Sequence, residues 1–308
     1  MTAITVIAIL AAAATIYGFV AMDSCERIKV APKGKKKKYQ VQEVPETGIL
    51  FMVIMAVALI VRYIAAAKYF GNETDMNCFI AWGDMIFKDG IGNFYSSDSF
   101  TDYPPGYMYI LYMVGAIRHV LGVAWNSTLS VMLTKTPAII ADLATAYLLF
   151  RIAGKRWTQK GAGILTAIYL FAPAVLLDGA IWGQTDAVFT FFVVLMIYLV
   201  TERKLIPSYF VFAVAVLVKP QSLIFTPVLI YGIIDQVFLD GFDWKNFWKN
   251  LGLGLAAIAM IALLMLPFAL AGLFLGMKCS SRMNESLVKK ITSILLVLSG
   301  ISLILKNL

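Results

Sequence analysis

A few polar side chains interrupt an otherwise apolar sequence, and they are of the types that bind or deprotonate hydroxyl and phosphate groups. The chain is 60% hydrophobic and 14% charged. An ionisable group costs about 2.5–3.5 kcal/mol at the centre of a membrane helix, so each one beside an apolar run is a functional candidate by default. The candidates are Asp75, Asp84, Asp102, Lys135, Asp178, Gln184, Asp186 and Lys219.

Asp75 begins an aromatic-rich stretch in which Phe79 and Trp82 follow at i+4 and i+7, on the same face of a helix. Aromatic rings pack against the apolar faces of sugar rings, and a carboxylate binds or deprotonates a hydroxyl. The pattern therefore favours a sugar site. The alternative is that Asp75 or Thr74 only caps the helix. Asp84 lies on the opposite helix face, so it shares a pocket with Asp75 only if the helix breaks between them.

Two lysines stand near the ends of apolar runs. Lys219 stands beside a proline turn, where it either extends to the membrane surface or binds a phosphate. Lys135 begins a helix that carries Asp142 seven residues later, on the same face and about 10 Å deeper. A buried aspartate needs a partner, so we expect Asp142 to contact a neighbouring helix.

The remaining composition argues against several site classes. Three widely spaced cysteines, Cys25, Cys78 and Cys279, suggest neither a zinc site nor a disulfide framework. A single histidine, His119, does not favour a Ser-His-Asp triad. We expect no metal and no cofactor. The net charge of +8 is spread over short clusters between apolar runs, which is typical of cytoplasmic loops and not of a nucleic-acid binder.

These side chains must be positioned by membrane helices, because a chain this apolar needs a bilayer around it. We predict an all-α polytopic protein of the cell membrane, with spans at 48–67, 135–150, 161–177, 187–200, 207–218, 223–234 and 251–268. This arrangement puts the basic clusters inside and the candidate polar residues outside.

The segment 106–125 is apolar enough to cross, but a crossing would put the basic cluster at 151–160 outside. We therefore expect it to lie along the outer surface as an interfacial helix. Residues 1–22 are predicted to form a transmembrane anchor, and 23–47 a basic cytoplasmic linker. Its lysine run is a topology signal or a contact with anionic lipid.

The charge rule fails in the tail, 269–308, where four basic residues would lie outside before a last span at 291–305. Either 251–277 forms a hairpin, or the tail was not built for this scaffold.

Six motifs in order resemble the GT-C superfamily of membrane glycosyltransferases that use polyprenyl-phosphate sugars. They look most like bacterial relatives of the dolichyl-phosphate-glucose glucosyltransferases, over about residues 47–268. The motifs are TDMNCFIAWGD (74–84), DYPPGY (102–107), KTPAIIADL (135–143), PAVLLDGAIWGQTDA (173–187), LVKPQSLIFTP (217–227) and LLMLPF (263–268).

The resemblance implies a hexosyltransferase that moves a hexose, with inversion, from a polyprenyl-phosphate donor to a glycan or lipid-linked acceptor at the outer face. Asp75 would be the general base and Lys219 would stabilise the leaving phosphate. The rest of the expected substrate-binding set is Trp82, Asp84, Asp102, Tyr103, Lys135, Asp178, Trp182, Gln184, Asp186 and Gln221.

The chain departs from the family at its carboxyl end, where members usually continue into a further loop and more helices. Residues 271–308 resemble the last repeat of TauE/SafE-type anion exporters instead. Two alternatives to the transferase follow: a transporter, or a truncated, inactive GT-C-like protein.

Overall fold

The computed structural model describes residues 48–91, 94–95, 101 and 103–280, with side chains up to residue 265. Within these residues all regular structure is helical and no β-strand occurs, which confirms the all-α prediction. The predicted anchor, the basic linker, the last span at 291–305 and Asp102 lie outside the described residues.

The elements follow one another without long connections in most of the chain. They are α2 (Ile49–Lys68), α3 (Glu73–Asp89), α4 (Pro105–Val120), α5 (Thr128–Ala153), α6 (Gln159–Leu170), α7 (Pro173–Val175), η2 (Leu176–Trp182), α8 (Asp186–Thr201), α9 (Leu205–Val218), η3 (Pro220–Phe225), α10 (Thr226–Ile233), η4 (Ile234–Leu239) and α11 (Trp244–Ser280).

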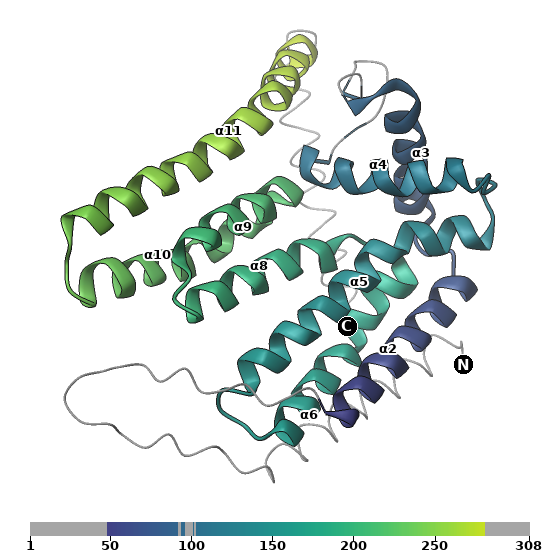
Figure 1. Ribbon diagram of the computed structural model, residues 1–308. Coiled ribbons are helices and arrows are strands. Elements are labelled where there is room, and N and C mark those ends of the chain that lie inside the picture. Colours follow the sequence, from purple (N-terminus) through teal and green to yellow (C-terminus); the bar gives the residue numbers. More distant parts are fainter. Residues whose placement is uncertain (1–47, 92–93, 96–100, 102, 281–308) are drawn as a thin grey trace, which may run out of the picture.

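The long helices form a bundle in which neighbours in sequence are mostly neighbours in space (Figure 1). Helix α5 packs against α2, α6 and α8, and α9 packs between α8 and α11. Polar side chains start several of these helices: Asn72, Ser127 and Thr158 accept hydrogen bonds from the backbone N–H groups of the first turns of α3, α5 and α6.

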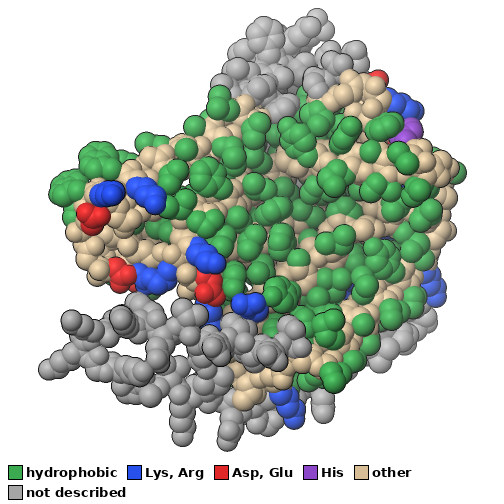
Figure 2. Space-filling model, viewed as in Figure 1, with side chains coloured by type: hydrophobic (Ala, Val, Ile, Leu, Met, Phe, Trp, Pro, Cys, Tyr) green, Lys and Arg blue, Asp and Glu red, His purple; other side chains and the backbone are tan. Residues whose placement is uncertain are grey.

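Four described helices are long and apolar enough to cross a membrane, or five segments if the bent pair α6 and α7–η2 counts as one span. The four are α2, α5, the continuous Pro220–Leu239 segment and the described part of α11. Figure 2 shows the result: one broad face is covered by hydrophobic side chains, and most of the charged ones gather along an edge. The chain is thus a multi-pass membrane protein.

Helices α3 and α4 lie together at one end of the bundle (Figure 1). They cross at Gly83 and Gly115, where a Cβ on Gly115 would come within 3.2 Å of the Gly83 Cα. Helix α4 is not among the candidate spans. With 16 residues, α4 is also shorter than a span of about 20 residues, and the interfacial placement of 106–125 stays a prediction.

The opposite end of the bundle carries the basic turns. Lys155 pairs with Glu202 at 2.6 Å, and Arg203 pairs with Asp235 at 3.2 Å and with Asp240. The candidate polar residues and the basic turns therefore lie at opposite ends of the helices, as the charge distribution predicted.

Of the two alternatives for the tail, the hairpin over 251–277 is wrong, because α11 runs as one helix from Trp244 to Ser280. Helix α11 continues past residue 268, where the last span of the GT-C-like region was predicted to end. Two other helices, α8 and α9, are 16 and 14 residues long, which is short for a span of about 20 residues.

Candidate functional site

The segment between α6 and α8 is the irregular part of the bundle, and it carries the predicted motif 173–187. The chain bends by 51° between Gln159–Leu170 and Pro173–Trp182. It then winds as the π-helix η2 and leaves it at Gly183, whose φ of +91° suits a glycine. The N–H groups of Gly183 and Gln184 both donate to the Asp178 carbonyl at 3.0 Å. This turn points Gln184 back toward α3.

Asp75 is the residue on α3 that meets this turn. Its Oδ2 accepts hydrogen bonds from the Trp182 indole N–H at 3.1 Å and from the Gln184 amide at 2.5 Å. The capping interpretation is wrong for Asp75, because Asn72 is the N-cap and accepts from the Asp75 backbone N–H at 3.1 Å. The side chain is thus oriented by two donors more than 100 residues away in sequence.

Lys135 joins η2 to the end of α2 from inside the bundle. Its ammonium donates to the carbonyls of Tyr69, Ala180 and Ile181, at 2.7, 3.2 and 2.9 Å. The residue is 1% exposed. An ammonium has three donors, so these contacts satisfy it. The structure thus gives Lys135 a role in holding η2 against the end of α2, which differs from the substrate contact expected for it.

A cleft of about 720 Å³ opens beside this junction. Side chains from the loop before α4, from η2 and the turn after it, and from the start of η3 line it. They are Tyr103, Pro104, Asp178, Trp182, Gln184, Asp186, Lys219, Pro220 and Gln221. Seven members of this lining belong to the expected substrate-binding set, and Asp75 is joined to the cleft through Trp182 and Gln184.

The charged wall of the cleft is an ion pair. The Lys219 ammonium contacts Asp186 Oδ1 and lies 5.4 Å from the centre of the Phe189 ring. Asp186 is 41% exposed and Lys219 is 18% exposed, so both side chains are accessible from the cleft that they line. A lysine that only extends to the membrane surface would not be expected to form this ion pair.

Tyr103 connects the cleft to the aromatic core. Its ring contacts those of Phe79 and Trp82, with centroids 5.5 and 5.6 Å apart. Burial raises the pKa of the Tyr103 hydroxyl above its usual range, so this hydroxyl is protonated at neutral pH.

Besides Lys135, two described members of the expected set do not line the cleft. Trp82 is 4% exposed and packs in the core among other rings, so it supports Tyr103 and is not among the side chains that line the cleft. Asp84 lies on the opposite face of α3, which is unbroken at Gly83, and pairs with Arg118 at 3.0 Å. Asp102 lies outside the described residues.

Sequence reasoning missed Arg62, which is the partner of Asp142. Its Nε donates to Asp142 Oδ2 at 3.1 Å, and its Nη2 donates to the Leu170 carbonyl at 2.8 Å, where α6 ends before the bend. Both residues are buried. A single arginine inside the apolar run 49–68 was the available signal, since such a residue needs a partner within the membrane.

The bundle, the helices across its end and the polar cleft define a helical membrane-embedded protein with a polar site at one end of the bundle. Among the residues described, no group of three or more histidine, cysteine or acidic side chains gathers as a metal site would require.

A family model described as GPI transamidase subunit PIG-U matches residues 83–301, more than two thirds of the chain. The protein belongs to the PIG-U family, a membrane-embedded, GT-C-like family. The match continues through 269–301, beyond the boundary expected at 268. Comparisons with curated proteins and with solved structures give no match.

Proposed function

We propose that the cleft binds a polyprenyl-phosphate-linked hexose, and that the protein transfers the sugar with inversion to a glycan or lipid-linked acceptor at the outer membrane face. One observation carries the proposal. Segments from four parts of the chain bring a carboxylate, an indole, amides and an ammonium to one cleft at one end of the bundle.

We assign a role to each charged group from the contacts that it makes. Both bonds to Asp75 reach Oδ2, and in the described part of the structure no hydrogen bond engages Oδ1. Oδ1 is therefore the oxygen that takes the proton of the acceptor hydroxyl as this oxygen attacks the anomeric carbon. The bond between that carbon and the phosphate oxygen breaks, and the phosphate leaves with the electron pair.

Lys219 is the group that stabilises the departing phosphate. Positioned cations at the site of developing charge are a major source of catalysis, and an ammonium is a common phosphate ligand. Lys219 now pairs with the half-exposed Asp186, which is free to turn toward solvent or toward a sugar hydroxyl when a phosphate arrives. Asp178 and Gln221 line the same cleft and would bind further hydroxyls of the sugar.

The experiment compares Asp75→Asn with Glu73→Gln, a change at an exposed carboxylate in the same helical turn. Full-length protein in liposomes is supplied with radiolabelled polyprenyl-phosphate glucose or mannose and a membrane lipid extract as acceptor. We expect Asp75→Asn to reduce transfer by about 10²–10⁴-fold, which is the usual contribution of a general base, and Glu73→Gln to leave transfer unchanged.

Donor binding is measured separately on the same variants, by native mass spectrometry. Unchanged transfer by Asp75→Asn would remove the base assignment. Donor binding without any transfer would favour the second candidate below. If the unmodified protein neither bound the donor nor transferred the sugar, the proposal as a whole would be overturned.

The second candidate rests on the family description, which names a subunit of a transamidase. In that role the protein would hold the glycan of a lipid-linked substrate in the same cleft for a partner subunit, and would not break a glycosidic bond. The Lys219–Asp186 wall and Trp182 would then serve binding alone.

A further inference from the structure

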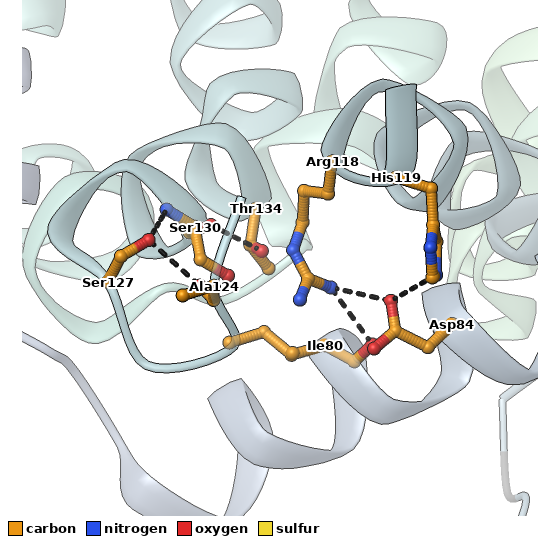
Figure 3. Close-up of polar contacts among 8 residues, drawn as sticks. All are labelled: Ile80, Asp84, Arg118, His119, Ala124, Ser127, Ser130 and Thr134. Carbon is orange, nitrogen blue, oxygen red and sulfur yellow. Dashed lines mark hydrogen bonds and ion pairs between the residues drawn. The ribbon is translucent and has the colours of Figure 1, made fainter. Parts of the chain in front are cut away.

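A second polar cluster lies on the face of α3 opposite Asp75. Asp84 Oδ1 accepts from Arg118 Nη1 at 3.0 Å and lies 3.3 Å from His119 Nε2. Arg118 Nη1 also donates to the Ile80 carbonyl at 3.3 Å. Figure 3 shows these contacts and that they use one end of the guanidinium only.

The other edge of the Arg118 guanidinium has unused donors. The side chain is 4% exposed, and its Nε is buried without a hydrogen-bond partner in the described structure; no bond to Nη2 occurs there either. In Figure 3 this edge faces away from Asp84, toward the segment with Ser130, whose Oγ is also buried and unpartnered among described residues. Nε and Nη2 form the parallel pair of donors that binds a phosphate or carboxylate in bidentate fashion.

The cluster opens into a small cleft of its own, with a volume of about 130 Å³. Its lining comprises Asp84, Arg118, His119, Gly122, Val123 and Trp125. The volume is about four times the 30 Å³ share of a water molecule, so the cleft admits a small polar group. Trp125 is 38% exposed, and its ring centre lies 5.7 Å from the Arg118 guanidinium carbon.

The surroundings of this cleft are those of a lipid-facing surface. Helix α4 and the turn after it expose Met113, Ile117, Val120 and Leu121, at 63, 45, 81 and 62%. Arg118 and His119 lie within this exposed apolar stretch. A helix that lies along the membrane buries such a face at the boundary between headgroups and acyl chains, and Trp125 is of the type enriched there.

We propose that the Arg118–His119–Trp125 cleft binds the phosphate of a bilayer phospholipid, with the acyl chains along the exposed apolar face of α4. Asp84 is not a ligand in this site. It holds the guanidinium by Nη1 and so leaves the Nε edge for the phosphate. The site is separate from the proposed sugar cleft and does not depend on sugar transfer.

The test measures phospholipid binding to the delipidated full-length protein in detergent by native mass spectrometry. Phosphatidylglycerol is the probe, diacylglycerol is the analogue without phosphate, and inorganic phosphate is the competitor. Loss of charge-assisted hydrogen bonds costs about 1.5–3 kcal/mol, so we expect Arg118→Gln to weaken phosphatidylglycerol binding about tenfold or more. Arg156→Gln, at an exposed arginine of the opposite end, controls for the loss of one positive charge.

Arg118→Gln also removes the partner of Asp84, so two further variants guard against misfolding. His119→Gln and Trp125→Leu keep the Arg118–Asp84 pair, and we expect each to weaken lipid binding severalfold. Equal binding of diacylglycerol, or an equal loss with Arg156→Gln, would overturn the proposal. Displacement of the lipid by inorganic phosphate at equal concentration would make this a free-anion site and would overturn the lipid assignment.

Discussion

The ammonium of Lys135 has a structural role that its sequence position did not reveal. The sequence could only mark it as an unusual cation at the start of an apolar helix. Its environment of three carbonyl oxygens, from Tyr69, Ala180 and Ile181, makes it a clamp on the irregular segment. The bonds hold the backbone immediately before Trp182, and so they fix the donors that orient Asp75.

We predict that Lys135→Met destabilises the protein, because three buried carbonyls lose a charged donor while the volume of the side chain is kept. Each lost charge-assisted bond is worth about 1.5–3 kcal/mol, and the bonds do not add fully, so the expected loss is about 2–4 kcal/mol. SDS-induced unfolding in detergent micelles measures it. Lys160→Met, at an exposed lysine, should lie within about 0.5 kcal/mol of the unmodified protein; equal effects of the two changes would contradict the clamp.

At the scale of elements, the placement of α3 against α4 determines where Asp75 and Asp84 lie. The two helices approach each other through Gly83 and Gly115, and side chains of ordinary size do not fit between them. Because α3 is continuous, the carboxylates of Asp75 and Asp84 point in different directions. Asp75 meets Gln184, and Asp84 meets Arg118.

This close crossing leads to a prediction for Gly115→Ala. The added methyl group would overlap the Gly83 carbonyl group, and backbone atoms cannot move aside as a flexible side chain does. Overpacking typically costs about 1–3 kcal/mol, and here it would also separate α3 from α4. We expect a loss of that size in SDS unfolding, whereas Gly252→Ala, where a Cβ meets nothing within 4 Å, should be neutral or slightly stabilising.

The bent segment α6–η2 is the element that the apolar pattern described least well. Its run of apolar residues predicted a straight span over 161–177 and a loop over 178–186. The structure has a 51° bend and a π-helix instead. Freed backbone carbonyls need internal donors within a membrane. Arg62 at Leu170 and Lys135 at Ala180 and Ile181 supply them from other helices.

At the scale of the whole molecule, charge divides the bundle into two ends. The proposed sugar cleft and the lipid cleft both lie near α3, α4 and the turns beside them, whereas the ion pairs of Arg203 and Lys155 lie at the other end. A transporter would need polar groups along a path at the bilayer midplane. The buried Arg62–Asp142 pair is engaged in helix contacts, so it does not supply polar groups to such a path.

Because charge divides the two ends of the bundle, we predict that thiols at the two ends differ in their accessibility from outside the cell. In a background with the native cysteines replaced by serine, Asn126→Cys and Lys160→Cys place single thiols at exposed positions of opposite ends. A thiol reagent that does not cross membranes should label Asn126→Cys in intact cells and should label Lys160→Cys only after permeabilisation. The reverse pattern would invert the proposed topology and would move the cleft to the inner face.

The sequence by itself determined the fold class, most helix positions, the division of charge between the two ends and the composition of the cleft. Hydrophobic runs and the sidedness of Lys and Arg are local properties, and they survive without knowledge of packing. The sequence also identified residues at the junction of the irregular segment and α3, because polar groups are costly in a membrane and are therefore functional candidates.

Only the tertiary structure decided which of these groups line the cleft and which are enclosed by the protein. Lys135 and Lys219 look alike in sequence, yet the first is enclosed by carbonyls and the second lies in an open cleft beside Asp186. Trp82 and Trp182 likewise separate into a core ring and a cleft wall. These differences depend on partners contributed by distant segments, whose approach is set by the α3–α4 crossing and by the bend before η2.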